Sequence, residues 1–330
     1  MQNTVLYFVI PCYNEESVLP MTSKLFYDKL MDLISSECIS DDSRILFVND
    51  GSTDATWSII NQLIKQDCHF LGISQSRNRG HQSSLLAGLM EAKDKCDVVI
   101  SMDCDGQDDI NAVDEMLSKY NGGADIVYGV RDDRTTDTWF KRTSAQLFYK
   151  VLKRFDKNTI YNHADFRLTS KRVLDVLSDY QEINLYLRGI FPLIGFSSDV
   201  CYYHRNERIS GKTHYSLSDM IGLGLNGLFN NGVRPLRCIT YLGIIMVFFS
   251  ICIVLWITIC MWQGMTVQGW SSILGILSFF QGVQLVCLGV ISEYVGRIYM
   301  ESKHRPRYVI SERCCDAFGS DISKQERIKS

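Results

Sequence analysis

The chain contains a run of 55 residues, Cys238 to Ser292, without any Asp, Glu, Lys, Arg or His. Within it, Ile239 to Trp262 and Trp270 to Ile291 are each long enough to cross a hydrocarbon core of about 30 Å as a helix that rises about 1.5 Å per residue. The link between them, Gln263 to Gly269, is short and uncharged. A helix buried in a large soluble core is the alternative, but so long a run favours a hairpin of two transmembrane helices.

Basic residues flank this run, whereas the link carries none. The flanking cations are Arg234, Arg237, Arg297, Lys303, Arg305, Arg307 and Arg313. Because short segments rich in Lys and Arg stay on the cytoplasmic side of a membrane, both ends of the hairpin are expected in the cytoplasm. Met1 to Thr4 contains no basic segment leading into an apolar one, so no signal peptide is predicted. The globular part and both termini are therefore expected on the cytoplasmic side.

The overall charge and the cysteine pattern exclude two broad classes of protein. The whole chain carries 34 Lys and Arg against 37 Asp and Glu, a net charge of -3. Without a strong basic field, binding to nucleic acid through phosphate neutralisation is not expected. The 12 cysteines include no Cys-x-x-Cys pair, so a zinc framework is not expected and reduced thiols in a cytosol-facing protein are predicted.

Charge and hydrophobic patterning divide the chain into four parts. We expect a globular domain over residues 1–214, a juxtamembrane helix over 215–234, the hairpin over 235–292 and a basic cytoplasmic tail over 293–330. The juxtamembrane segment keeps apolar residues at helical spacing between Leu217 and Leu228. It could lie along the membrane interface as an amphipathic helix or pack as an ordinary helix, and both alternatives remain open.

Apolar runs of strand length alternate with helical patterns through the globular part. The predicted strands are Val5–Ile10, Arg44–Val48, Phe70–Ser74, Asp97–Met102 and Ile126–Val130, and the predicted helices lie near Val18–Met31, Asp54–Gln66, Gln82–Lys93 and Ala112–Leu117. Alternation of this kind predicts an α/β fold with a mostly parallel sheet covered by helices on both faces. Ligands of such sheets bind beyond the carboxyl ends of the strands.

Polar residues cluster where three of these strands end. The clusters are Pro11–Glu16, Asn49–Asp54 and Asp103–Asp109. Taken singly, each fits a helix cap or a turn, but together they predict one site at the mouth of the sheet. Asp103 and Asp105 would place two carboxylates close together, and their repulsion favours a bound divalent cation.

These motifs, in this order and ahead of an uncharged hairpin, resemble the inverting family-2 glycosyltransferases of the GT-A fold. The resemblance is specifically to the membrane-anchored polyprenyl-phosphate glycosyltransferases, which include dolichyl-phosphate mannose synthases and bacterial undecaprenyl-phosphate glucosyltransferases. Further segments that carry it are Asp165-Phe166-Arg167-Leu168, Tyr203 to Tyr215 and Glu293 to Arg297. It extends from about Thr4 to Arg307.

The resemblance implies a nucleotide-diphosphate sugar as donor and a metal ion that bridges its phosphates. The nucleotide-sugar-binding residues that it implies are Pro11, Tyr13, Glu15, Asp50, Ser52, Arg77, Asp103, Gln107, Asp108, Arg205, Arg208 and Lys212. Asp103 and Asp105 would be the metal ligands, and their oxygen atoms suit Mg²⁺ or Mn²⁺. Such an ion would neutralise charge on the departing diphosphate.

The resemblance further implies catalytic roles for Asp105, Asp165 and Arg205. Asp165 is expected to act as a base or to orient the sugar, although it could instead simply pair with Arg167. Arg205 belongs to the stretch Tyr203 to Tyr215, which resembles a loop that closes over the donor diphosphate. A solvated basic loop beside anionic lipid headgroups is the alternative for that stretch.

On the acceptor side, Arg131 and Arg142 resemble the family's ligands for a lipid phosphate, which an arginine fork binds well. The expected reaction is transfer of glucose from UDP-glucose to undecaprenyl phosphate in a bacterial inner membrane, for cell-surface glycan modification. UDP-GlcNAc, UDP-Gal and GDP-mannose are alternative donors, and a non-catalytic nucleotide-sugar sensor or scaffold is the alternative to an enzyme. By analogy with the family, a homo-oligomer, a flippase and a downstream membrane glycosyltransferase are expected partners.

Overall fold

The computed structural model describes residues 4–131, 163–182, 187–204 and 270–314, together with scattered positions between 245 and 263. The chain divides into two compact units. The first comprises residues 1–149, 158–215 and 306–330, and the second comprises residues 150–157 and 216–305.

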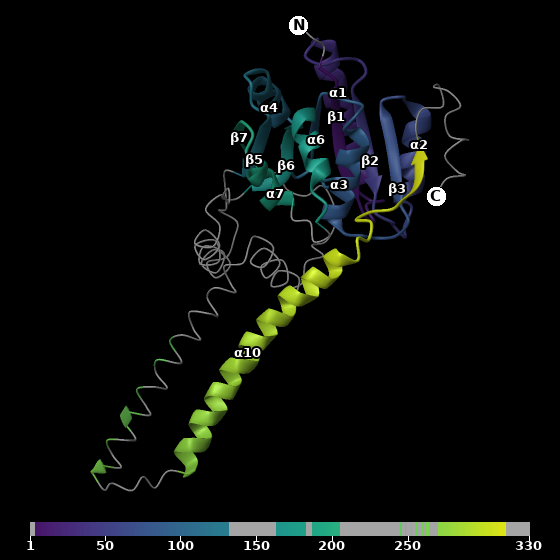
Figure 1. Ribbon diagram of the computed structural model, residues 1–330. Helices are drawn as coiled ribbons and strands as arrows, with labels where there is room; N and C mark the ends of the chain where they lie inside the picture. The colour runs from purple at the N-terminus through teal and green to yellow at the C-terminus, as the bar shows by residue number, and fades with distance from the viewer. Residues whose placement is uncertain are drawn as a thin grey trace. The chain divides into compact units, whose positions relative to one another are not determined.

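The first unit is built on an eight-stranded sheet with the order β7-β5-β6-β4-β1-β2-β3-β8 (Figure 1). The strands are β1 Leu6–Cys12, β2 Arg44–Asn49, β3 Phe70–Gln75, β4 Val98–Ser101, β5 Ile126–Arg131, β6 His163–Ser170, β7 Ser198–Tyr203 and β8 Ile310–Cys314. Strand β1 runs parallel to β2 and β4, β2 runs parallel to β3, and β5 runs parallel to β7. Strands β6 and β8 are antiparallel to their neighbours. The prediction of a mostly parallel sheet is confirmed.

Helices cover both faces of this sheet. They are α1 Leu19–Ser35, α2 Thr56–Gln66, α3 His81–Ala92, α4 Ala112–Asn121, α6 Lys171–Asp179 and α7 Leu187–Ile194. Side chains alternate between the faces of a strand, so Phe8 and Ile10 of β1 pack in one core with α1, α2 and α4, whereas Tyr7 and Val9 pack in the other with α3, α6 and α7. The four predicted helices of the first 121 residues are present, with α1 extending further than expected.

Strand β8 extends the sheet from a part of the chain for which only a basic tail was expected. Its Glu312 accepts a hydrogen bond from the Trp57 indole at 2.9 Å, and its Arg313 donates to Glu91 at 3.0 Å. Backbone hydrogen bonding to β3 completes the pairing, which Figure 1 shows at the edge of the sheet. The strand is short and polar, so no hydrophobic alternation marks it in the sequence.

The second unit contains α10, Trp270–Ser302, which includes the whole of the second predicted span and continues beyond it. Among the described residues, one helix is long and apolar enough to cross a membrane, Phe279–Ser302, with a mean hydropathy of 1.3 and none of its apolar window buried. The first predicted span, Ile239 to Trp262, lies mostly outside the described residues, so the two-helix hairpin stays a prediction. The predicted juxtamembrane helix over 215–234 also lies outside them.

Candidate active site

A cavity of about 310 Å³ lies beyond the carboxyl ends of β1, β2 and β4, where the sequence predicts a site. Its lining residues are Pro11, Cys12, Tyr13, Glu15, Asp50, Asn78, Gly80, His81, Ser84, Asp103, Cys104 and Asp105. All three predicted polar clusters contribute to this set. The parallel order of the three strands brings their ends together, although the clusters are far apart in the sequence.

The loops after β1 and β2 are fastened to each other by hydrogen bonds. The Asn14 amide donates to Ser52 Oγ at 3.0 Å, and the Asn14 side chain accepts from the Thr53 amide at 2.9 Å. Asn14 has a φ of 55°, a left-handed conformation that Asn tolerates better than most residues. Ser52 therefore positions the loop that carries Tyr13 and Glu15, and it is not itself among the residues that line the cavity.

Asp50 is buried beneath the loop that follows β3. One of its carboxylate oxygens accepts from the Arg79 amide at 2.9 Å and from the Gln75 side chain at 3.0 Å, and the other accepts from the Gly80 amide at 2.9 Å. Burial raises the pKa of Asp50, although these two backbone hydrogen bonds oppose the shift. Arg77 lies on the same loop, exposed and outside the cavity lining. Asp50 thus lines the cavity and also anchors the loop after β3, which forms part of the cavity wall.

Asp108 lies behind the two predicted metal ligands. It is 7 % exposed, accepts a hydrogen bond from Tyr203 at 2.6 Å, and has the Arg131 guanidinium 3.7 Å away. Burial, followed by the charge of Asp103, raises the pKa of Asp108 to about 6. Neither Asp108 nor the neighbouring Gln107 lines the cavity, and Gln107 donates its backbone amide to Asp105 at 3.1 Å. Both residues therefore support the acidic loop.

The donor set in this loop fits a hard divalent cation. Asp103 and Asp105 both present carboxylates to the cavity, and carboxylate oxygens are the ligands that Mg²⁺ and Mn²⁺ prefer. Burial is the main cause of the raised pKa of Asp108, and the negative charge of Asp103 adds to it; a cation bound beside Asp103 would relieve this second contribution.

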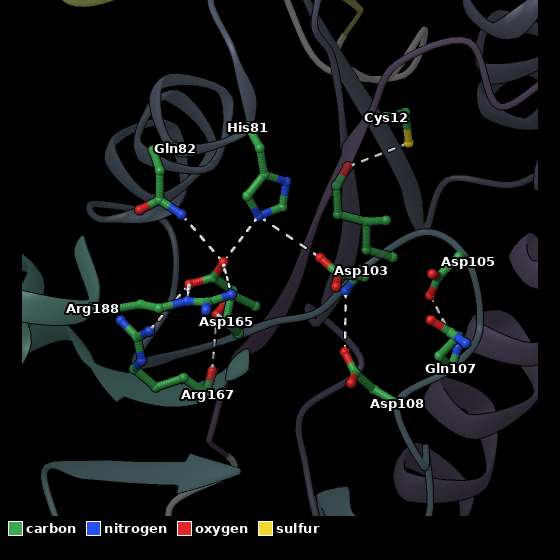
Figure 2. Close-up of polar contacts among 12 residues, drawn as sticks. Cys12, His81, Gln82, Asp103, Asp105, Gln107, Asp108, Asp165, Arg167 and Arg188 are labelled. Carbon is green, nitrogen blue, oxygen red and sulfur yellow. Dashed lines mark hydrogen bonds and ion pairs between the residues drawn. The ribbon is translucent and has the colours of Figure 1, made fainter. Parts of the chain in front are cut away.

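Asp165, near the amino end of β6, is the centre of an ion-pair network (Figure 2). It is 4 % exposed, and the Arg188 guanidinium donates one hydrogen bond to each of its carboxylate oxygens, at 3.0 and 2.9 Å. Gln82 donates to it at 3.2 Å, and His81 Nε2 lies 3.3 Å from the same oxygen. The expected partner Arg167 is present but more distant, at 3.6 Å.

The surroundings of Asp165 favour a positioning role over a basic one. Burial alone would raise its pKa, but the charge of Arg188 and the hydrogen bond with His81 outweigh burial and hold that pKa well below the usual value. A carboxylate so strongly stabilised as an anion, with both oxygens engaged, accepts a proton poorly. Among the alternatives that the sequence left open, the structure favours ion pairing of Asp165, with Arg188 as a nearer partner than the expected Arg167.

His81 connects Asp165 to the metal-binding loop. Its Nε2 atom lies 3.3 Å from Asp165 and 3.7 Å from Asp103, and its ring lines the cavity. Burial lowers the pKa of His81, but the hydrogen bond with Asp165 and the charge of Asp103 outweigh it and raise that pKa to about 9. His81 is therefore a cation between two acids at neutral pH.

From the sequence, His81 is expected near the nucleotide only as part of the stretch Ser76 to Gln82, which resembles the family's loop after the third strand, and Arg188 is not expected in the site. One feature of the sequence could have indicated a role for His81: it places a basic group in the first turn of α3, where cations are disfavoured unless another interaction holds them. Arg188 belongs to α7, far along the chain from the other clusters, and no motif marks it.

The remaining predicted residues are Arg131 and four that lie outside the described part of the chain. Arg131 ends β5, and its Nε donates to the Tyr203 hydroxyl at 3.1 Å. This contact holds the guanidinium beside the acidic loop. The predicted residues that lie outside the described ranges are Arg142, Arg205, Arg208 and Lys212.

An α/β domain with an acidic cavity at its strand ends and carboxylates suited to a divalent cation fits an enzyme that binds a phosphorylated substrate through a metal ion. Residues 7–178 match the model of glycosyl transferase family 2, and the chain belongs to this family. The protein is accordingly a glycosyltransferase with a GT-A-like domain.

Relatives match far beyond this domain. The chain is 44 % identical to the uncharacterized glycosyltransferase YkoT of Bacillus subtilis (strain 168), over 98 % of this chain and 96 % of the relative. It is 38 % identical to the bactoprenol glucosyl transferase of Shigella phage SfV, over 92 % of this chain and 96 % of that protein. It is 36 % identical to the prophage bactoprenol glucosyl transferase homolog of Escherichia coli (strain K12), over 92 % and 97 %.

Among solved structures, one similar chain is glucosyl-3-phosphoglycerate synthase from Mycobacterium tuberculosis, in complex with Mn²⁺, uridine diphosphate and phosphoglyceric acid. Its identity is 14 % and its TM-score is 0.47, and the match covers 70 % of this chain and 78 % of that one.

Proposed function

We propose that the protein transfers glucose from UDP-glucose to undecaprenyl phosphate at the cytoplasmic face of a bacterial inner membrane. The observation that carries this proposal is the extent of the similarity to bactoprenol glucosyl transferases. The family domain ends at residue 178, yet the relatives match over 92 % of the chain, so the match must reach into the apolar segments as well. An enzyme with a lipid acceptor needs both parts.

The cavity lining supports the donor side of this proposal. Tyr13 is 45 % exposed, so its ring is available to the nucleoside, while Glu15 and Asp50 offer acceptors for hydroxyl and base N–H groups. Asp103 and Asp105 would hold Mg²⁺ or Mn²⁺, which neutralises negative charge on the diphosphate as it leaves. Arg205, Arg208 and Lys212 are proposed as the cations that close over that diphosphate.

The acceptor phosphate needs little activation, because a phosphate monoester with a second pKa near 6 is largely dianionic at neutral pH. One of its oxygens attacks the anomeric carbon on the face opposite to the diphosphate. The new carbon–oxygen bond forms as the bond to the diphosphate breaks, the sugar inverts, and the nucleoside diphosphate departs. The larger task is to hold two anions together, for which Arg131 and Arg142 are proposed on the acceptor and the metal ligands on the donor.

His81 and Asp165 are proposed to shape the donor side of the reaction centre. The paired Asp165 fixes His81, and His81 presents its positive charge to the cavity beside Asp103. A fixed cation at this point would stabilise negative charge that develops on the donor diphosphate. Asp165 then acts through His81 and contacts no reacting atom.

The test is transfer of radiolabel from a panel of UDP- and GDP-sugars into organic-extractable lipid by the purified full-length protein, with undecaprenyl phosphate and Mg²⁺ or Mn²⁺. Asp105→Ala should abolish transfer. Asp109→Asn is the matched control, because Asp109 lies on the same loop, caps the turn before α4 through Asn111, and does not line the cavity.

Labelled lipid from UDP-glucose, absent in Asp105→Ala and retained in Asp109→Asn, would support the proposal. Labelling from UDP-GlcNAc, UDP-Gal or GDP-mannose alone would replace glucose as the proposed sugar but would support the same class of reaction. Binding of donors without transfer or hydrolysis would overturn the proposal in favour of a nucleotide-sugar sensor.

A further inference from the structure

Strand β8 lies along β3 at the edge of the sheet (Figure 1), and the register of the pair shifts at the carboxyl end of β3. Ser74 of β3 pairs with Glu312. The next residue of β3, Gln75, pairs with Ile310, so Ser311 is an extra residue in β8. An extra residue of this kind is a β-bulge, which bends a strand locally and is often found beside functional sites.

The segment around the bulge holds the backbone of β3 on both sides of Gln75. Ser311 Oγ donates a hydrogen bond to the Ser74 carbonyl oxygen at 3.0 Å. The Ser76 amide, one residue past the end of β3, donates to the Val309 carbonyl oxygen at 2.9 Å. The start of the β3–α3 loop, residues 76–80, is therefore fastened to the segment that forms β8.

Gln75 joins this pairing to Asp50, which lines the cavity. The Gln75 side chain donates a hydrogen bond from Nε2 to Asp50 Oδ1 at 3.0 Å, and both residues are only 3 % exposed. A hydrogen bond to a charged acceptor is stronger than one between neutral groups, and exclusion of water strengthens it further. Gln75 therefore fixes one carboxylate oxygen of Asp50.

Asp50 in turn holds the β3–α3 loop. Its two oxygens accept from the backbone amides of Arg79 and Gly80, at 2.9 Å each. Asn78 and Gly80 of this loop line the cavity together with Asp50. A continuous series of contacts thus runs from β8 through Gln75 and Asp50 to the cavity wall.

We propose that Gln75 is a positioning residue, through which β8 sets the β3–α3 loop for binding of a nucleoside diphosphate. Gln75 is not among the residues that line the cavity, and it acts through Asp50. Because coupling between two sites is reciprocal, nucleotide binding should stabilise the docking of β8 by the same factor. Strand β8 lies outside residues 7–178, which match the family model, so the donor site depends on a segment beyond the family domain. The choice of ligand rests on the proposed function.

The alternative is that β8 only covers the edge of the sheet. An exposed edge strand invites pairing with other chains, and a short polar strand protects it. In that case substitutions in β8 would lower the melting temperature but leave the affinity of the folded protein for nucleotide unchanged. Nucleotide affinity therefore separates the two roles.

The test measures the Kd of UDP and of GDP, each with Mn²⁺, by isothermal titration calorimetry on the full-length protein in detergent, below its melting temperature. Gln75→Met keeps the length of the side chain but removes the N–H donor. It should weaken binding of the nucleotide that the wild type prefers by about fivefold, the lower end of typical couplings, because Asp50 keeps its two backbone hydrogen bonds. Gln66→Met is the matched control, because Gln66 is the exposed last residue of α2, and it should leave the Kd unchanged.

A second variant detaches β8 without a change in the β3–α3 loop. Tyr308 and Ile310 pack against the core cluster on the α3 face, so the double substitution Tyr308→Ser and Ile310→Ser should release the strand. We expect a loss of affinity of about fivefold again, with no further loss on addition of Gln75→Met, because both changes break the same series of contacts. Val309→Ser changes an exposed side chain and keeps the carbonyl oxygen that Ser76 contacts, so it should bind nucleotide like the wild type.

Amide hydrogen exchange gives a readout that needs no sugar transfer. In Gln75→Met and in the Tyr308→Ser and Ile310→Ser variant, the Arg79 and Gly80 amides should exchange faster than in the wild type, even without nucleotide. In the wild type, bound nucleotide should slow exchange within β8. An unchanged Kd in both variants, or unchanged exchange of these two amides, would overturn the inference.

Failure of the proposed function would give a different result. In the transfer assay, Gln75→Met should raise the KM for the donor more than it lowers kcat. A wild type that binds a nucleotide but transfers no sugar would count against the proposed function alone, because affinity and exchange still report on Gln75. If the wild type binds neither nucleotide, the proposed donor is wrong, whereas exchange of the Arg79 and Gly80 amides still decides whether β8 and Gln75 set the loop.

Discussion

Replacement of Asp165 by Asn tests whether this residue positions other groups or accepts a proton. The substitution keeps the size of the side chain but removes the charge that Arg188, His81 and Arg167 share. Arg188 has 38 % of its side chain exposed and can turn toward water, whereas Arg167 is 0 % exposed and would lose a carboxylate 3.6 Å away.

The expected loss of stability in Asp165→Asn follows from this difference in exposure between the two arginines. Removal of one partner from a buried ion pair destabilises a protein by about 3–5 kcal/mol, and the exposure of Arg188 places Asp165→Asn near the lower limit, at about 3 kcal/mol. For a unit of this size each kcal/mol lowers the melting temperature by about 2–4 °C, so a decrease of about 10 °C is expected. Arg188→Met, which leaves Asp165 with His81, Gln82 and Arg167, should cost less, about 2 kcal/mol.

The pH dependence gives a second measure of the same effect. The pKa of Asp165 in the folded protein is well below its unfolded value of about 3.9. Its contribution to stability is therefore fully present above about pH 4 and is lost as the pH falls through the folded pKa. The melting temperatures of the wild type and Asp165→Asn should differ at neutral pH and approach each other in strong acid.

The assay combines thermal unfolding of the full-length protein in detergent with transfer kinetics over a range of pH. A positioning role predicts loss of stability together with a fall in turnover of about tenfold, without loss of the acidic limb that protonation of a general base would give the pH profile. If Asp165→Asn melts at the wild-type temperature but loses about 10³-fold or more in turnover, the residue is a general base and the reasoning given above is wrong.

Three further predictions concern single contacts of the site. His81→Gln removes the cation beside the metal-binding loop and should lower turnover by about 10–100-fold, measured as kcat and KM for the donor, whereas an unchanged kcat would refute its proposed role. Gly51 has a φ of 65°, and a Cβ at this position would lie 2.5 Å from the backbone of Arg77, so Gly51→Ala should destabilise the protein by about 2–3 kcal/mol. Gly80 has a φ of 89° but faces open space, so Gly80→Ala should destabilise it by only about 1 kcal/mol. Equal melting temperatures of the two variants would contradict the close approach at Gly51. Tyr203→Phe removes the 2.6 Å hydrogen bond to Asp108, so the pKa of Asp108 should rise above about 6 and stability should fall by about 1–3 kcal/mol, as measured by carboxylate NMR titration and thermal unfolding.

The acidic loop and the first two strand ends were predictable because their evidence is local. A buried apolar run marks each strand, the polar residues that follow it mark its end, and the parallel order inferred from alternating elements brings those ends together. The cavity confirms this convergence for Pro11, Tyr13, Asp50 and the two acids after β4. Strand β8 was not predictable in this way, because it is short, polar and paired with an edge that only the folded sheet provides.

Roles within the site depended on partners that are distant along the chain. Ser52 and Asp108 are expected to contact the nucleotide sugar, and the structure adds contacts that the motifs do not indicate: Ser52 bonds to the loop after β1, and Asp108 accepts from Tyr203 of β7. Their role toward the nucleotide sugar stays a prediction. Motif position indicates only the neighbourhood of a residue, whereas the direction of its side chain decides what it contacts.

By itself the sequence determined the apolar character of the second unit, the alternating α/β pattern and the order of the acidic motifs, since each depends on residues close together in the chain. Only the tertiary structure decided that Arg188 and His81 neutralise Asp165. The physical reason is that ion pairs act over a few ångströms in space. Such distances between residues widely separated in the sequence are set by strand order and register, which no short segment contains.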